Sequence, residues 1–545
     1  MKKTRILSIL SASALVSMVV VGIPSAAHAA GPLCDGKVPI TSCQGATSDS
    51  APYVMQVPAN FNGTLVLYSH GYRPNVPIPA GIPGYGGYTV TNTPQPGPLV
   101  GGKDTSVIAY LLGHGYAVAG SGFARQGWNA DSAIATDAEL IGAFKTQFPT
   151  TKHVVAWGES LGGYITQGLA EKYPNLVDAV APMCMAENLP AELTEAGDFL
   201  WGFKTLFDPS IKGGNYSAGA AGYAEAMGDL VKVFTALGKL QAGISTGVWP
   251  DTSSATGKAL ATAGVPSRSA LLLLGLMAGL PTQSAHFDSI SGPDGALKVT
   301  FPLAVSPALA ILENGATAAA LAVLVTQDVE QQAGGAVFDN TKTDYAARVV
   351  NERVVFNAAL SGNTAIDALL GALSPLNPGA PRAVGNPAAI AKMNGLLMHS
   401  DVVNVPTITM VGVADPVTSA GASMRLANQY ADQYAAEKAK AYSDYAKTHE
   451  YNPPKKKLIS IWSTTPAAYT TFTSAGAPIT TTAAAPGTNH CNFTADQYLV
   501  VAQELVFAGQ NGTFLGGGTL NNFVRKAKNL SVDPLFSFAV MKYYE

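Results

Sequence analysis

Charged side chains are scarce in this sequence. Only 13% of its 545 residues are Asp, Glu, Lys or Arg, the formal net charge is −3, and no long run of Lys or Arg occurs. A nucleic-acid-binding protein would be expected to carry a basic patch, so we predict no nucleic-acid partner. Hydrophobic residues make up 47% of the chain, which is enough for a large core, in one domain with an insertion or in two domains.

Long apolar runs are also rare, except at the N-terminus. Three cations among the first five residues precede an apolar run over residues 6–22, and Ala27-His28-Ala29 follows. This order is typical of a signal peptide with a small-x-small cleavage site. We predict cleavage after Ala29 and export of the mature chain to the periplasm or the medium, without stable membrane insertion. A retained membrane anchor is the alternative.

Apolar segments alternate with helical patterns in two parts of the chain, which we predict to form one α/β core from residues 30–185 and 405–545. Asn62-Gly63 is the predicted turn between the first two strands. Strands that are almost wholly apolar indicate a mostly parallel sheet with helices on both faces. The predicted strands are 53–58, 63–72, 116–123, 152–157, 177–185, 405–415 and 455–464, and the predicted helices are 105–115, 131–148, 160–174, 423–450 and 495–512.

Between these parts, residues 186–404 are rich in Ala, Leu and Gly and are largely helical in pattern. We predict a helical cap inserted before the strand that ends in Asp415. Its stretch 268–281 is too short to span a membrane, and its stretch 307–329 is interrupted by Glu313. These stretches are expected to be core against the sheet or, alternatively, to line a groove for an acyl chain or polymer.

The segment Gly158-Glu159-Ser160-Leu161-Gly162 lies between a strand pattern and a helical pattern. A G-x-S-x-G sequence in that context forms a sharp turn that exposes the serine hydroxyl, and small flanking residues are needed because the turn is tight. The alternative is an ordinary Gly/Ser turn. We predict Ser160 to be a nucleophile, which requires a base and an orienting carboxylate.

Chain order selects the acid and the base. In this architecture the acid ends a later strand and the histidine follows the last strand. Asp415 ends an apolar strand, whereas Asp401 precedes it and Asp496 lies in the final helix. His490 follows the last strand, whereas His449 ends a charged helix before it. The predicted triad is therefore Ser160, Asp415 and His490.

An oxyanion hole needs two backbone N–H donors. Leu161, which follows the nucleophile, would supply one, and Tyr72, in the loop after the second strand, would supply the other. His70-Gly71 could instead be an ordinary turn at the end of a strand.

The stretches "YSHGY", "GYAVAGSGFARQGW", "GESLGGY", "VGVADP" and "HCNFT" follow one another in this order. With them the chain resembles the α/β-hydrolases, particularly secreted bacterial members with a large helical cap, over about residues 50–200 and 400–510. The resemblance implies the same triad and oxyanion donors. There is no HGGG run, and Glu159 stands before Ser160 where feruloyl esterases and tannases, which share the Cys after the histidine, place a second Cys.

Four cysteines are present. Cys34 and Cys43 flank a short loop and are expected to pair. Cys184 and Cys491 should both lie along the carboxyl edge of the sheet, where a disulfide would hold the loop that carries His490. Two buried free thiols are the alternative, although exported proteins seldom leave cysteines unpaired.

The leading functional prediction is carboxylic ester hydrolysis through an acyl-enzyme, without a cofactor or a metal, on a small-molecule or polymeric ester. The low charge of the cap favours neutral or apolar substrates. Phe123, Trp128 and Tyr164 are candidates for the substrate pocket, although aromatic residues beside a site are as often packing.

The sequence leaves two other functions open. A serine exopeptidase could use Glu187, Glu192 and Glu195, at the entry to the cap, to hold a free amino group. The alternative for these residues is an acidic first helical turn, with Glu187 or Asn188 near the cap position. A non-catalytic binding protein on a hydrolase scaffold would be expected to have lost a triad member.

We expect intact-mass analysis of the mature protein to show no alkylated cysteine without reductant and four after reduction. Two alkylated thiols before reduction would contradict the pairing of Cys184 with Cys491.

Overall fold

The structure is a computed structural model that describes residues 31–83, 86–292, 305–396, 400–474 and 476–532. The predicted signal peptide and its cleavage site lie outside the described residues.

A ten-stranded sheet forms the centre of the described chain, in the order β1-β2-β3-β5-β4-β6-β7-β8-β9-β10. The pairs from β5 to β9 are parallel, and the pairs at either end are antiparallel. This confirms the predicted α/β class with a mostly parallel sheet. The strands are β1 (Leu33–Cys34), β2 (Ile40–Ala46), β3 (Pro52–Pro58), β4 (Thr64–Ser69), β5 (Ala117–Ser121), β6 (His153–Glu159), β7 (Ala179–Met183), β8 (Thr407–Gly412), β9 (Leu458–Ser463) and β10 (Leu530–Ser531).

The strands on either side of Asn62-Gly63 are consecutive in sequence but are not neighbours in the sheet. β5 lies between them, antiparallel to β3 and parallel to β4. The reason is burial: every residue of β4 is buried, whereas burial in β3 largely alternates. An alternating strand suits the antiparallel side of a sheet, and a wholly buried strand suits its parallel centre.

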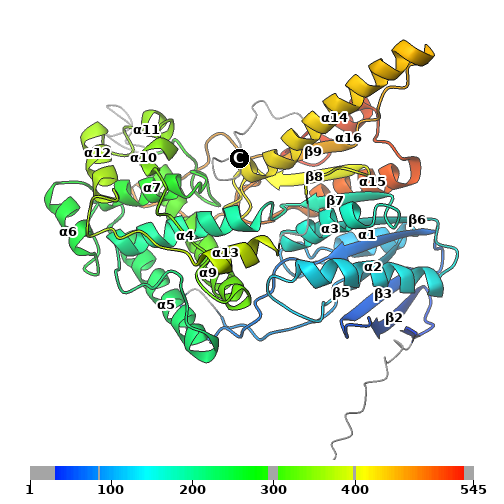
Figure 1. Ribbon diagram of the computed structural model, residues 1–545, viewed down its shortest axis with the longest axis horizontal. Helices are drawn as coiled ribbons and strands as arrows, with labels where there is room; N and C mark the ends of the chain where they lie inside the picture. Colours follow the sequence, from blue (N-terminus) through cyan, green and yellow to red (C-terminus); the bar gives the residue numbers. More distant parts are fainter. Residues whose placement is uncertain (1–30, 84–85, 293–304, 397–399, 475, 533–545) are drawn as a thin grey trace, which may run out of the picture.

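Helices cover both faces of the sheet (Figure 1). Alternate residues of β4 point to opposite faces: Val66 and Tyr68 pack with α1 (Ser106–Gly113) and α15 (Ala495–Asn511), and Leu65 and Leu67 pack with α2 (Ala130–Gln147) and α3 (Leu161–Lys172). The first turns of α14 (Ala420–Thr448) are buried, and the rest projects from the body of the molecule. A short helix, α16 (Gly517–Val524), precedes β10.

The chain between β7 and β8 is helical and has an apolar core of its own; we call it the cap. The far end of α9 leaves that core, because Val329 and Ala333 pack among the side chains of the sheet domain. The cap helices are α4 (Leu189–Leu206), α5 (Gly219–Gly243), α6 (Ala255–Thr262), α7 (Ser267–Met277), α9 (Ser306–Ala333), α10 (Tyr345–Arg348), α11 (Glu352–Val355), α12 (Asn363–Ala372) and α13 (Pro387–Asn394).

Among the described residues, α9 alone is both long and apolar enough to cross a membrane. Two thirds of its most apolar window is buried inside the protein. Buried core helices have the same composition, so α9 is accounted for as the central helix of the cap.

Two glycine-to-alanine substitutions in the cap should have opposite effects on stability. A Cβ at Gly275 of α7 would collide with the side chain of Ile311 on α9, whereas a Cβ at Gly228 of α5 would meet nothing. We expect Gly275→Ala to lower the free energy of unfolding by about 1–3 kcal/mol through overpacking. Gly228→Ala should raise it by about 0.5–1 kcal/mol through helix propensity. Urea unfolding measures both, and a destabilised Gly228→Ala variant would contradict the packing described.

Candidate active site

Ser160 lies in a strained turn between β6 and α3. Its backbone has φ 56° and ψ −124°, a conformation that costs a non-glycine residue about 1–3 kcal/mol. Two hydrogen bonds hold it: Ser160 N donates to the carbonyl of Met183 (3.0 Å), and Ala186 N donates to the carbonyl of Ser160 (3.2 Å). The turn presents the hydroxyl at the carboxyl end of β6.

The glycines around Ser160 are required by close backbone contacts. A Cβ at Gly162 would overlap the carbonyl oxygen of Ser69, and a Cβ at Gly158 would overlap that of Gly162. These overlaps are the physical reason for small residues at both positions, as the sequence motif predicts.

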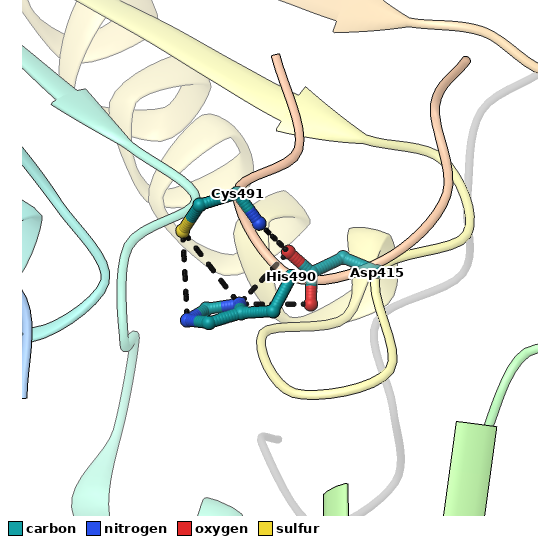
Figure 2. A group of neighbouring side chains, drawn as sticks. All are labelled: Asp415, His490 and Cys491. Atoms are coloured by element: carbon teal, nitrogen blue, oxygen red, sulfur yellow. Dashed lines mark hydrogen bonds and ion pairs between the residues drawn. The ribbon is translucent and has the colours of Figure 1, made fainter. Parts of the chain in front are cut away.

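His490 and Asp415 form a close pair. His490 Nδ1 lies 3.0 Å from each carboxylate oxygen of Asp415 (Figure 2). Asp415 is buried and also accepts the backbone N–H groups of Val417 (2.9 Å), Thr418 (3.0 Å) and Cys491 (3.2 Å). Because a carboxylate only accepts, the proton of the neutral imidazole is held on Nδ1, and Nε2 remains as the basic nitrogen.

The surroundings of His490 favour its charged form. Burial lowers the pKa of His490, but the charge of Asp415, its hydrogen bond to the imidazole and the nearby carboxylate of Glu159 raise it by more, so the pKa lies above its ordinary value of 6.5. The imidazole is therefore a stronger base than a free histidine.

A disulfide between Cys184 and Cys491 holds the loop that carries His490, as predicted, and Cys34 pairs with Cys43. Cys184 follows β7 directly, so the bond ties the histidine loop to the strand beside the elbow. Cys184 and Cys491 both have positive φ, as does Asn489. Non-glycine residues in this conformation persist where the surrounding structure imposes it.

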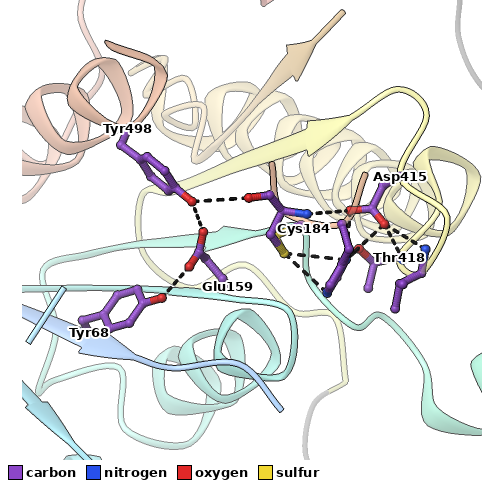
Figure 3. The surroundings of a disulfide bond; sticks show 9 residues. Tyr68, Glu159, Cys184, Asp415, Thr418 and Tyr498 are labelled. Carbon is purple, nitrogen blue, oxygen red and sulfur yellow. Dashed lines mark hydrogen bonds and ion pairs between the residues drawn. A yellow bond between two sulfur atoms is a disulfide. The ribbon is translucent and has the colours of Figure 1, made fainter. Parts of the chain in front are cut away.

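Glu159, next to Ser160, makes a second connection to the loop that carries His490. Its carboxylate accepts hydrogen bonds from the hydroxyls of Tyr68 (2.5 Å) and Tyr498, and the Tyr498 oxygen lies 3.4 Å from the Cys491 carbonyl oxygen (Figure 3). Burial raises the pKa of Glu159, and the two tyrosines oppose that rise. Sequence reasoning missed both tyrosines; the signal was an acidic residue at the end of a wholly apolar strand, which must find buried donors.

The loop after β4 passes beside Ser160. A Cβ at Gly71 would lie 3.3 Å from Ser160 Cβ and 3.9 Å from its Oγ. Within the described ranges, the backbone N–H groups of Tyr72 and Leu161 donate no hydrogen bond to the protein. Both predicted oxyanion donors are thus available to a ligand. In the same part of the structure, Ser160 Oγ forms no hydrogen bond with His490.

The strand order, the strained elbow at the end of β6, the acid after β8 and the histidine after β9 form one recognisable arrangement. The chain has the α/β-hydrolase fold.

Comparisons with known proteins give distant structural likenesses. Feruloyl esterase B from Aspergillus oryzae matches at 13% identity over 88% of this chain and 83% of its own, with a TM-score of 0.37. An esterase from the same organism matches at 14% over 78% and 71%, with a TM-score of 0.28. An esterase from Pyrococcus furiosus matches at 14% over 29% and 55%, with a TM-score of 0.21. No protein-family profile matches the chain, and no curated protein matches its sequence.

A cavity of about 80 Å³ lies between the cap and the loop that follows Asp415. Pro416 and Val417 line it from the hydrolase core, and α4 and α9 line it from the cap. Its walls are apolar apart from Glu192 and Glu195. Pro416 follows Asp415 directly, so this apolar cavity adjoins the Asp415–His490 pair.

The two cavity carboxyls differ in their partners. Glu192 Oε1 accepts the backbone N–H of Glu187 (2.7 Å), and burial raises the pKa of Glu192 to about 8. Neither oxygen of Glu195 has a hydrogen-bond partner in the described structure, and burial together with neighbouring carboxylates raises its pKa well above the ordinary value. Burial therefore favours the protonated form of both carboxyls.

The three aromatic residues predicted for the substrate pocket are core residues. Phe123, Trp128 and Tyr164 are each at most 3% exposed and belong to the apolar cluster beneath α2 and α3. Trp128 packs edge-on against Tyr164 (centroids 5.1 Å apart), and Phe123 packs on His70 (4.7 Å). None of the three lines the cavity beside Asp415, and their part in binding a substrate stays a prediction.

His449, Asp496 and Asp401, which chain order excluded from the predicted triad, do not bond to Asp415 or His490 in the described structure. His449 is exposed at the end of α14, and Asp496 is exposed in the first turn of α15. Asp401 is buried and forms an ion pair with Arg425.

Asn188 is the N-cap of α4, and its side chain accepts from Ala191 N (3.2 Å).

Asp415, His490 and Cys491 lie close enough to resemble a metal-binding group. Cys491, however, is in a disulfide, and so it offers no thiolate to a metal. The pairing of the other two with each other fits proton transfer better.

We expect His490 to titrate above 6.5, observed by NMR of its imidazole C–H groups. Glu159→Gln removes one carboxylate that favours the imidazolium, so the titration should move to lower pH. The control is Glu139→Gln on α2, whose carboxylate bonds Ser48 and is not among the groups that shift His490. An unmoved titration in Glu159→Gln, or an equal shift in the control, would contradict this electrostatic account.

Proposed function

We propose that this chain is a secreted serine hydrolase that cleaves carboxylic esters, with Ser160 as nucleophile, His490 as general base and acid, and Asp415 as the orienting carboxylate. The observation that carries the proposal is the buried Asp415–His490 pair, which is fastened by a disulfide to the strand beside the Ser160 elbow.

The reaction follows from these positions. Ser160 Oγ attacks the ester carbonyl while His490 Nε2 takes its proton, and the backbone N–H groups of Leu161 and Tyr72 stabilise the negative oxygen of the tetrahedral intermediate. The imidazolium, stabilised by Asp415, then gives its proton to the leaving alkoxide and an acyl-enzyme remains. Water, deprotonated by His490, attacks the acyl group, and the acid and Ser160 are released.

The cavity beside Asp415 supports an ester with one apolar arm. Its walls come from Leu189, Leu193, Phe199 and small residues of α9, which would exclude water from an acyl or alcohol chain. A free small ester or the end of a polyester chain would both present such an arm.

Secretion is supported by two features. The N-terminal sequence has the pattern of a cleaved leader. Two disulfides are present, and disulfides persist in oxidising compartments.

A serine exopeptidase is the second candidate, favoured by one observation. Glu195 lies at the cavity wall, buried and without a partner, beside Glu192. A substrate's free ammonium group would supply the missing donor and would draw both carboxyls into their ionised form. The cavity is otherwise apolar, and burying an ammonium ion costs several kcal/mol before pairing, which favours the ester.

We expect the purified mature protein to hydrolyse p-nitrophenyl esters with a rate that depends on acyl length, and to leave aminoacyl anilides intact. Ser160→Ala should lower ester turnover by about 10⁴-fold or more, because the nucleophile is lost. Spectrophotometric assays of both substrate series on both proteins make the measurement.

Glu195→Gln separates the two candidates. For an esterase it should leave the kcat/KM of apolar esters within about threefold, since burial favours the neutral form of Glu195 and the amide is neutral and of the same size. Preferred cleavage of anilides with a free amino group, lost in Glu195→Gln, would establish the exopeptidase instead. Ester turnover that persists in Ser160→Ala would rule out both.

A further inference from the structure

Asp328 is a buried carboxylate on cap helix α9 that bonds only partly within its own helix. Its side chain is fully buried, and one partner, Gln332 Nε2 (3.0 Å), lies one turn further along α9. The remaining hydrogen bonds go to the hydrolase core, to residues about 200 or more positions earlier in the sequence.

Two core loops donate to this carboxylate. From the loop after β4, Tyr72 Oη (3.3 Å) and Asn75 Nδ2 (2.7 Å) donate. From the loop after β5, the backbone N–H of Trp128 donates (2.6 Å). One cap side chain therefore joins both loops that border the elbow.

The backbone of the loop after β5 packs directly against the Asp328 carboxylate. Gly127 has a positive φ, and a Cβ there would overlap the Asp328 carboxylate. Gly127 N also donates to the carbonyl of Arg73 (2.8 Å), so the two loops are bonded to each other beside the carboxylate. Gln332, which bonds Asp328, also donates to the backbone carbonyl of Trp128 (3.0 Å).

The loop from Gly71 to Arg73 has no helix or strand to fix it. Gly71 lies against Ser160, and Tyr72 carries the oxyanion donor of the proposed function. A hydrogen-bond donor stabilises an oxyanion only when it is aimed to within a few tenths of an ångström. The Tyr72 side chain is the part of this loop that Asp328 holds.

Resting on the proposed function, we propose that Asp328 is a positioning residue: it anchors the oxyanion loop to the cap, so that the cap completes the catalytic geometry as well as the substrate cavity.

The test is Asp328→Asn in the full mature chain. The amide has the same size, but its NH₂ group is a donor where the carboxylate has an acceptor oxygen. It would therefore face the four groups that now donate to Asp328. We expect kcat for a p-nitrophenyl ester to fall by about 10–100-fold, the range for a misplaced donor, with KM within about twofold. The affinity for an aryl boronic acid, which forms a tetrahedral adduct with the serine, should fall by the same factor as kcat/KM.

The matched control is Asp229→Asn. Asp229 is equally buried, lies in the cap, and accepts Lys212 N (2.9 Å), Gly213 N (2.7 Å) and Tyr216 Oη (3.0 Å), all within the cap. It should lose thermal stability, as Asp328→Asn should, while kcat and boronate affinity stay within about twofold of the original protein. A comparable loss of kcat in both variants would overturn the proposal.

Tyr72→Phe keeps the test decisive if Asp328→Asn does not fold. It removes only the hydroxyl and should lower kcat and boronate affinity together by about 3–10-fold, a fraction of the loss for a missing donor. Unchanged values in a folded Asp328→Asn, or in Tyr72→Phe, would overturn the proposal. Failure of the proposed function is seen separately, as ester turnover that survives Ser160→Ala.

Discussion

Ser160 has a positive φ, and its N–H and carbonyl are hydrogen-bonded to Met183, at the end of β7, and to Ala186, three residues further on. The same neighbouring strand leads into Cys184, whose disulfide with Cys491 fixes the loop of His490. Glu159 adds a polar connection to that loop through Tyr498. The strain at Ser160 and the position of His490 therefore depend on one short piece of structure at the carboxyl edge of the sheet, where ligands bind in open α/β sheets.

The cap holds the loops on both sides of this edge. Asp328 bonds the two loops near the elbow. At the other side, Asp288 accepts the backbone N–H groups of Tyr469 (2.8 Å) and Thr470 (2.9 Å), and His286 contacts the carbonyl of Thr482 (3.0 Å), all in the segment that leads to His490. That segment has little secondary structure, so side chains of the cap supply the contacts that a strand or helix would otherwise provide.

The buried carboxyl groups around the site differ in the number of hydrogen-bond donors that contact them. Asp415 has three backbone donors and an imidazole, which together stabilise a negative charge. Glu195, a short distance away on the cavity wall, has none, and its pKa is raised well above the ordinary value. Asp415 can thus stabilise an imidazolium through its hydrogen bond to His490, whereas burial in an apolar cavity favours the neutral form of Glu195.

The sequence alone determined the fold class, the tight turn at Ser160 and the pairing of Asp415 with His490. Each depends on local pattern and on connectivity, since periodicity identifies strands and helices and an α/β topology fixes which strand ends meet at one edge. Tertiary structure alone decided that β5 separates β3 from β4 and that Phe123, Trp128 and Tyr164 are buried in the core. It also decided that Asp328, on the cap, bonds to Tyr72 in the hydrolase core. Periodicity gives the face on which a side chain lies, whereas its partner is set by the packing of elements far apart in the sequence.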